Sequence, residues 1–331
     1  SDRFMGLIEQ ATREPGFDDS WDLVDPHTKK VVKTVSAKTL WVKLIQNRVE
    51  TGEPYIVFKN TVQEALPFYQ LEQGLRVHHS NLCSEITLAT NEERTAVCCL
   101  SSVNLEEYDE WKNDENFIPD LIRMLDNVIS YFVENAPDTL SKAKYSAEME
   151  RSLGLGAMGF HAYLQRHNVP FESAIAKSHN ARMFRHIKSE AVNATTTLAV
   201  ERGEAPDAIG EGVRNVHLLA VAPNASSSII CGNTSPSIEP YRANAFTQKT
   251  KSGSSLLKNE YLEHILQELG EDTDEVWKSI ITNNGSVQHL DFLDDWTRDV
   301  FKTAVEIDQR WIIEMASDRQ KEICQSQSLN I

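Results

Sequence analysis

The sequence lacks an excess of positive charge and any long hydrophobic run. Its 33 lysine and arginine residues are outnumbered by 49 aspartate and glutamate residues, which gives a formal net charge of −16. An acidic surface disfavours non-specific binding to nucleic acid or to anionic membranes. No apolar stretch approaches the length of a membrane span, and no signal-like segment opens the chain. We therefore expect a protein that binds neither nucleic acid nor membrane.

Cysteine is scarce and follows no disulfide framework. The five cysteines are odd in number and lie at no compact spacing: Cys83, Cys98, Cys99, Cys231 and Cys324. This pattern argues against a disulfide-stapled secreted protein and favours a reducing compartment, where thiols serve chemistry or packing. We therefore expect the protein to be cytoplasmic.

The sequence also lacks the compact motifs of common metal and phosphate sites. There is no C-x-x-C or H-x-x-x-H pair, and the G-x-x-x-x-G-K pattern of a phosphate-binding loop is absent. A zinc site drawing on His78, His79 and the cysteines is an alternative. Adjacent Cys98 and Cys99 would point to opposite faces of a strand, however, so both would rarely bind one ion. We favour buried, inert thiols over a metal site and assign no metal ligand.

Helical periodicity alternates along the chain with short apolar runs. Apolar residues at helical spacing predict a helix from Phe117 that stops before Pro137, a second at about 173–201, and a third from Trp296 to Met315. The predicted strands are 54–59, 96–103 and 216–222, and the segments 203–214 and 243–255 are predicted loops. Short buried strands separated by long helices favour parallel βαβ units, so we expect an α/β fold without repeats or a dividing linker.

The stretch NLCSEI (81–86) places an amide, a thiol and a carboxylate at alternate positions: Asn81, Cys83 and Glu85, here called the triplet. In an extended segment these side chains point to the same side. A neighbouring carboxylate raises the pKa of a thiol, which is unsuitable for a thiolate nucleophile. It suits a thiol that stays protonated and gives up a hydrogen atom, with Glu85 as a base toward a substrate hydroxyl.

The segment 216–230 is an apolar run that breaks at Pro223 into small polar residues. Asn224 or one of the serines could cap a helix that begins there. Exposed amides and hydroxyls at a helix N-terminus would suit a phosphate group. On local sequence alone we favour an ordinary helix cap over an anion site.

Four long segments, in order, resemble the large subunit of class I ribonucleotide reductase, most closely its phage and bacterial members. They are NLCSEITLATNEERTAVCCLSSVNL (81–105), RSLGLGAMGFHAYL (151–164), APNASSSIICGNTSPSIEPY (222–241) and the closing stretch from DQRWI (308–312) to CQSQSLNI (324–331). Their order and combined length make the resemblance specific, and it extends over essentially the whole chain.

The resemblance implies roles for individual residues. Cys83 matches the cysteine that becomes a thiyl radical and removes the 3′-hydrogen of the ribose. Glu85 matches the base on the 3′-hydroxyl, and Asn81 the amide that hydrogen-bonds the sugar hydroxyls. Cys98 aligns with one of two cysteines that reduce the substrate by closing into a disulfide, whereas Cys99 falls where the family varies. The substrate diphosphate would be held by Pro223, Asn224, Ala225, Ser226 and Ser227.

The resemblance also implies an incomplete fold. Residues 1–331 would form roughly the second half of a ten-stranded α/β barrel, with Cys83 on a central finger loop. The N-terminal half-barrel with the second reducing cysteine, the ATP cone and the C-terminal tail would be absent. Both chain ends look cut, so we expect a fragment of a longer protein in preference to one piece of a split subunit.

The partners implied are those of the complete subunit. They are a ribonucleoside diphosphate, a metal-containing small subunit that supplies the radical, thioredoxin or glutaredoxin, and a second copy in a homodimer. The chain itself would bind no cofactor, and ATP or dNTP effectors would bind mainly outside it. The host-cell cytoplasm is the expected location if a phage encodes the protein. The alternative is a catalytically incompetent nucleotide-binding or structural fragment of the same fold.

Overall fold

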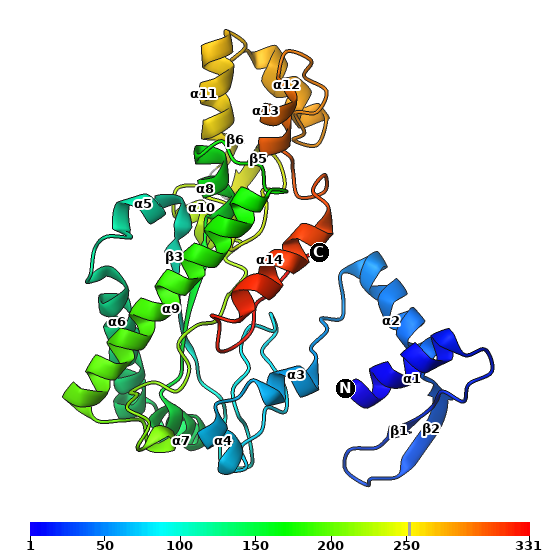
Figure 1. The fold of residues 1–331 in the computed structure, drawn as a ribbon, viewed down its shortest axis with the longest axis vertical. Helices are drawn as coiled ribbons and strands as arrows, with labels where there is room; N and C mark the ends of the chain where they lie inside the picture. Colours follow the sequence, from blue (N-terminus) through cyan, green and yellow to red (C-terminus); the bar gives the residue numbers. More distant parts are fainter. Residues whose placement is uncertain (251–252) are drawn as a thin grey trace.

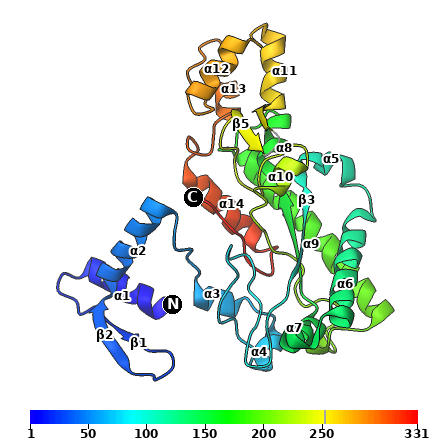
Figure 2. The same cartoon turned by 180° about the vertical axis from the view of Figure 1, so that it is seen from behind.

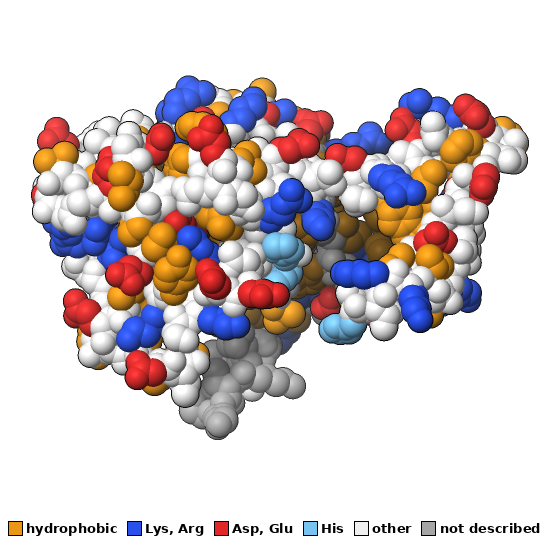
Figure 3. Space-filling model, turned by 90° about the horizontal axis from the view of Figure 1, so that it is seen from below, with side chains coloured by type: hydrophobic (Ala, Val, Ile, Leu, Met, Phe, Trp, Pro, Cys, Tyr) orange, Lys and Arg blue, Asp and Glu red, His pale blue; other side chains and the backbone are white. Residues whose placement is uncertain are grey.

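The first 51 residues form two helices and a hairpin, here called the N-terminal module. In the computed structural model, which describes residues 1–250 and 253–331, its elements are α1 (Asp2–Arg13), β1 (Ser20–Val24), β2 (Val31–Ser36) and α2 (Ala37–Thr51). The strands pair antiparallel. Among the module's residues, all of them described, only Ile8 and Ala37 are buried. The N-terminal module lies to one side of the rest of the chain (Figures 1 and 2). Figure 3 shows a hollow with exposed hydrophobic side chains between the module and the rest of the chain.

The predicted strand at 54–59 is wrong. Residues 54–58 adopt no regular secondary structure, and α3 (Lys59–Glu64) begins at the last residue of the predicted strand, followed by α4 (Phe68–Glu72). Val57 and Phe58 remain 40% and 54% exposed. An apolar run resembles a strand in sequence, but a strand also needs a paired neighbour, and none of the described residues pairs with this run.

A layer of parallel extended segments lies at the centre of the molecule, here called the parallel layer. β3 (Cys99–Asn104) pairs in parallel with β4 (Leu153–Met158), with Cys99 opposite Leu153. Parallel bridges add residues 217–221 beside β4 and residues 325–328 beyond them. All six residues of β4 are buried because it has neighbours on both edges and packing on both faces. The predicted α/β fold with parallel βαβ connections is therefore confirmed here.

The predicted strand at 216–222 is only partly right. Leu219 and Val221 make isolated parallel bridges to Leu155 and Gln327, and the segment forms no continuous strand. The segment donates and accepts hydrogen bonds on both sides, for example from the Leu153 amide to the His217 carbonyl at 2.8 Å. It is thus an extended inner segment of the layer with interrupted pairing.

Helices cover the parallel layer. The connection between β3 and β4 carries α5 (Tyr108–Trp111), α6 (Phe117–Asn135) and α7 (Ser141–Glu150), and β4 is followed by α8 (Phe160–Arg166) and α9 (Ala174–Arg202). The helix predicted from Phe117 to a point before Pro137 and the helix predicted at about 173–201 are confirmed by α6 and α9. α9 packs against α6 and α14 (Gln309–Gln320) in the same part of the molecule (Figure 1). These contacts bury one large apolar core that includes Ile122, Leu155, Phe184 and Met315.

A second, smaller core lies in residues 245–301, here called the distal module. It holds β5 (Ala245–Thr250), β6 (Gly253–Lys258), α11 (Glu260–Leu269), α12 (Asp274–Thr282) and α13 (Asp295–Val300). Leu262, Trp277 and Phe301 are buried there. The loop predicted at 243–255 is wrong, because β5 and β6 form an antiparallel pair; residues 251–252 lie outside the described residues.

The single helix predicted from Trp296 to Met315 is also wrong. The chain is helical in α13 and α14 but not between Phe301 and Asp308. The Glu306 carboxylate accepts hydrogen bonds from the Thr303 amide and hydroxyl, each at 2.8 Å, and the Asp308 side chain caps α14 by accepting from the Arg310 amide at 2.9 Å. These local side-chain bonds compete with helix continuation.

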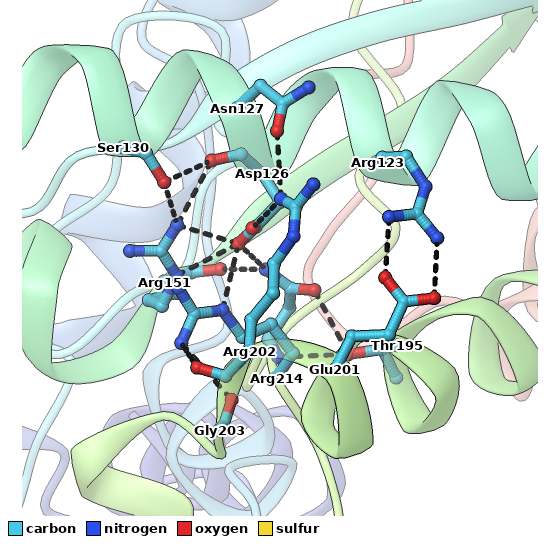
Figure 4. A network of polar contacts seen from close by, with 11 residues as sticks. Arg123, Asp126, Asn127, Ser130, Arg151, Thr195, Glu201, Arg202, Gly203 and Arg214 are labelled. Atoms are coloured by element: carbon cyan, nitrogen blue, oxygen red, sulfur yellow. Dashed lines mark hydrogen bonds and ion pairs between the residues drawn. The ribbon is translucent and has the colours of Figure 1, made fainter.

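A buried polar network joins α6 and α9 to Arg151 at the end of α7 and to Arg214 in the loop after α9 (Figure 4). Asp126 on α6 is fully buried and pairs with Arg151, Arg202 and Arg214. Burial would raise the pKa of Asp126, but the arginines, Arg151 first, hold it below its usual value. A buried carboxylate needs such partners to stay ionised, so the network fixes one end of the parallel layer. Among the helices of the described residues, none is long and apolar enough to cross a membrane.

Candidate functional site

The triplet lies in a turn, so the predicted extended conformation is wrong. The Ser84 amide donates to the Asn81 carbonyl at 3.1 Å, and Ser84 has a left-handed φ of 66°. The Asn81 side-chain oxygen accepts from the Ile86 amide at 3.1 Å and thereby closes the turn. The three side chains are therefore not directed to one side by the alternation of a strand.

The turn nevertheless brings Cys83 and Glu85 within electrostatic reach of each other. Cys83 is half-buried, and burial together with the nearby Glu85 carboxylate raises the pKa of its thiol. Glu85 is 3% exposed, and its Oε2 atom is buried without a hydrogen-bond partner in the described structure. A thiol whose pKa is raised thus lies close enough to the Glu85 carboxylate to interact with it electrostatically.

Cys98 lies immediately before β3, at the edge of the parallel layer. Burial raises the pKa of Cys98 to about 12, although the Gln325 amide, which donates to the sulfur at 3.4 Å, acts in the opposite direction. Cys99 begins β3 and packs against the large core. The two neighbouring thiols therefore have different surroundings, and only Cys98 contacts the closing segment of the chain.

Residues 324–328, here called the C-terminal segment, connect Cys98 with the triplet. The Gln325 side-chain oxygen accepts from the Thr87 amide at 3.2 Å, two residues beyond Glu85. The Ser326 amide donates to the Glu85 carbonyl at 3.0 Å. The structure thus brings Cys98 and the triplet to one region through a third segment.

Residues 223–227 follow the inner segment of the parallel layer. Asn224 has a left-handed φ of 53°. Its side-chain nitrogen donates to Ser102 Oγ at 2.9 Å and to the backbone carbonyls of Ala157 and Ala222. α10 (Ser227–Ile230) is one turn long and has no side-chain cap, so the predicted cap by Asn224 or a serine is wrong. Asn224 fixes the loop to β3 instead, and Ala225, Ser226 and Ser227 are left exposed.

A cavity of about 550 Å³ opens beside the triplet, lined by Asn81 together with His78, His79 and Arg94. Among the described residues, no group of three His, Cys, Asp or Glu side chains could hold a metal ion. The cavity is lined by amide, imidazole and hydroxyl groups together with the side chains of Glu92 and Arg94.

Sequence reasoning missed Cys324, His217 and Gln325. Cys324 Sγ accepts from the Leu218 and Leu219 amides at 3.0 and 3.2 Å. Burial would raise the pKa of Cys324, but the combined interactions with His217, Lys188 and the Leu219 backbone lower the pKa to about 6. Cys324 and Gln325 lie in the closing segment CQSQSLNI, but the contacts among these residues form only in the parallel layer, so the segment alone did not indicate their roles.

Comparison with known proteins gives consistent matches over the whole chain. The family model described as "Ribonucleotide reductase, barrel domain" matches residues 1–208 and 206–331. A Frog virus 3 protein named as a ribonucleoside-diphosphate reductase large subunit is 50% identical over all of this chain and 58% of its own length. The large subunit of Invertebrate iridescent virus 3 is 48% identical over all of this chain and 53% of its own length.

One solved structure also matches closely. The Actinobacillus ureae class Id ribonucleotide reductase alpha subunit superposes with a TM-score of 0.86 at 39% identity, over 98% of this chain and 57% of its own length. The chain therefore spans little more than half the length of the viral and bacterial proteins it matches.

Proposed function

The chain belongs to the ribonucleotide reductase barrel-domain family, and we propose on that basis that it is part of the catalytic domain of a ribonucleoside-diphosphate reductase large subunit. Its fold is part of an α/β barrel-type domain. We extend the proposal to the finer architecture: residues 1–331 are a partial barrel of ten strands when complete, with the triplet on its finger loop. The reaction is the reduction of ribonucleoside diphosphates to deoxyribonucleoside diphosphates.

The observation that carries the proposal is the pairing of a protonated thiol with a buried, unpartnered carboxylate oxygen at Cys83 and Glu85. In the proposed reaction a Cys83 thiyl radical removes the 3′-hydrogen of the ribose, and Glu85 accepts the proton of the 3′-hydroxyl. The Asn81 oxygen is engaged by the Ile86 amide, so its nitrogen is the atom left to donate to a sugar hydroxyl. Orientation of this kind contributes through proximity.

Cys98 supplies reducing electrons in the proposed reaction by closing a disulfide with a second cysteine. The pKa of its thiol, about 12, keeps it protonated at neutral pH until that step. The partner cysteine belongs to the part of the large subunit that this chain does not span. Cys99 packs against the core and takes no part.

The substrate diphosphate is proposed to bind at residues 223–227. Asn224 holds the loop to Ser102 of β3, and exposed Ser226 and Ser227 offer hydroxyls to phosphate oxygens. Charge-assisted hydrogen bonds to phosphate are stronger than neutral ones, which suits a site made of hydroxyl and amide groups.

We also propose the partners of the complete subunit. The radical comes from a metal-containing small subunit, thioredoxin or glutaredoxin restores the thiols, and the complete large subunit forms a homodimer in the cytoplasm. The chain itself binds no cofactor, and the effectors ATP and dNTP bind mainly outside it.

The test uses a complete large subunit that contains this chain, assembled with its small subunit. Cys83→Ser should abolish deoxynucleotide formation and leave nucleotide binding intact, since the serine O–H bond is too strong to replace a thiol in hydrogen transfer. Ser226→Asp with Ser227→Asp should instead weaken nucleotide binding by charge repulsion. Exposed Cys231→Ser is the matched control and should retain activity.

Deoxynucleotide formation above background by the Cys83→Ser enzyme would refute the radical role. Nucleotide affinity unchanged by the double aspartate substitution would exclude the diphosphate site. An inactive wild-type assembly that still binds nucleotide would favour the catalytically incompetent alternative.

A further inference from the structure

The structure assigns Gln325 a positioning role: we infer that its side-chain amide holds the Cys98 sulfur and the backbone next to the triplet in one fixed arrangement. The hydrogen bonds behind this inference are present whether or not the protein is an enzyme. Only the expected effect of Gln325 on turnover rests on the proposed function.

The Gln325 side chain bridges three segments that are far apart in sequence. It is 3% exposed, and its nitrogen donates to the Leu153 carbonyl at 2.8 Å and to Cys98 Sγ at 3.4 Å. Its oxygen accepts from the Thr87 amide at 3.2 Å. Both of its polar atoms are thus used, and a buried amide satisfied in this way is costly to replace.

The backbone on either side of this amide is fixed as well. The Gln325 amide donates to the Leu219 carbonyl at 3.1 Å, and the next amide, Ser326, donates to the Glu85 carbonyl at 3.0 Å. The C-terminal segment, which is itself bonded to the inner segment of the parallel layer, therefore contacts both Glu85 and Cys98. The separation of the reducing thiol from the triplet depends on this attachment.

The surroundings of Cys98 make the Gln325 donor important for its ionisation. The ionisable neighbours that act on Cys98, namely Cys99, Glu150 and Cys324, all raise the pKa of its thiol. Burial and these neighbours disfavour the thiolate, whereas the Gln325 N–H favours it by donating to the sulfur. Without this donor, the thiolate of Cys98 should form only at still higher pH.

The test measures alkylation of Cys98 by iodoacetamide in the protein, followed by mass spectrometry between about pH 8 and pH 10. Gln325→Met keeps the length and removes the donors and the acceptor. We expect Cys98 alkylation to slow by about tenfold, because losing one hydrogen bond to an ionised group changes its pKa by roughly one unit. Alkylation of exposed Cys231 should be unchanged.

The matched control is Gln327→Met, which alters another amide of the same segment. Gln327 contacts Ala316, Arg319 and Gln320 and neither Cys98 nor Thr87. Its substitution should leave the pH profile of Cys98 alkylation in place. Gln325→Glu, which keeps an acceptor for Thr87 but places a charge near the sulfur, should slow alkylation at least as much as the methionine variant.

A wild-type profile in Gln325→Met, or an equal shift in Gln327→Met, would overturn the positioning role. Unfolding curves of each variant identify loss of fold, in which case the Gln325→Glu profile decides the matter. In the complete subunit, Gln325→Met should lower kcat with little change in KM. If the wild-type subunit fails to reduce ribonucleotides while the alkylation shift is present, the proposed function fails and the role of Gln325 stands.

Discussion

Glu85 combines three features that are rarely found together in a carboxylate residue. It is almost fully buried, its backbone carbonyl is held by Ser326, and one carboxylate oxygen has no partner among the described residues. Buried carboxylates normally have their oxygens satisfied, so an unsatisfied one is expected where a ligand or a proton must be received.

Replacing Glu85 with glutamine should make Cys83 more reactive toward iodoacetamide. Burial and the Glu85 charge both raise the pKa of Cys83, so removing the charge lowers that pKa and increases the thiolate fraction below it. Since Cys83 is only half-buried and solvent screens the charge, we expect a rate increase of about two- to fivefold at roughly pH 8. Cys231 serves as the internal control. An unchanged or slower Cys83 rate would mean that the two side chains do not interact.

At this scale the sequence supplies candidate residues, but it mispredicts the backbone conformation that carries them. The alternate spacing of Asn81, Cys83 and Glu85 predicts an extended segment. In the structure, a left-handed Ser84 and the hydrogen bond between Asn81 and Ile86 form a turn instead. No local pattern indicates the role of Gln325, because its side chain forms hydrogen bonds with residues 87, 98 and 153, which are far from it in the sequence.

Among the elements, β4 is the most tightly constrained. It lies between β3 and the inner segment, and its two glycines allow the neighbouring chains to approach closely. A Cβ atom at Gly156 would lie 2.6 Å from the Ala220 carbonyl oxygen and 3.3 Å from Val221 Cα. Backbone atoms in the middle of a parallel layer cannot move away easily.

Gly156→Ala should therefore lower the free energy of unfolding by about 2–4 kcal/mol, measured by urea denaturation. Gly6→Ala in α1 is the matched control, because a Cβ atom there meets nothing within 4 Å. Alanine favours a helix over glycine, so the control should be neutral or slightly stabilising. Equal stability of the Gly156→Ala variant and the wild type would contradict the close packing of the layer.

The elements that were predicted well are those with a local signal. Apolar spacing predicts both α6 and α9, and Pro137 marks the end of α6; in the structure Ser173 caps α9 and Gly203 follows it. The break between α13 and α14 was missed because apolar spacing continued across it, although Asp308 is a helix-cap residue that could have marked it. The β5–β6 pair was missed because polar, glycine-containing segments resemble loops when their pairing partner is not considered.

Across the whole molecule, burial is uneven. The large core of the central helices and the parallel layer contrasts with the N-terminal module, in which Ile8 and Ala37 alone are buried among its described residues. Apolar side chains of the module are exposed: Val24, Val31, Val32 and Val49. The chain covers only part of its relatives' length, so these side chains are candidates for contact with the remainder of a complete subunit.

Amide hydrogen exchange should separate these regions. Opening a segment requires breaking its tertiary contacts, and a module with so little buried surface should open at low free energy. We expect amides of β1 and β2 to exchange about a hundredfold or more faster than those of β4, which is buried along its whole length. The comparison is restricted to amides that face a paired strand, so that it separates tertiary burial from secondary structure. Equal protection of β1 and β4 would mean that the N-terminal module is stabilised as strongly as the parallel layer, contrary to its exposed surface.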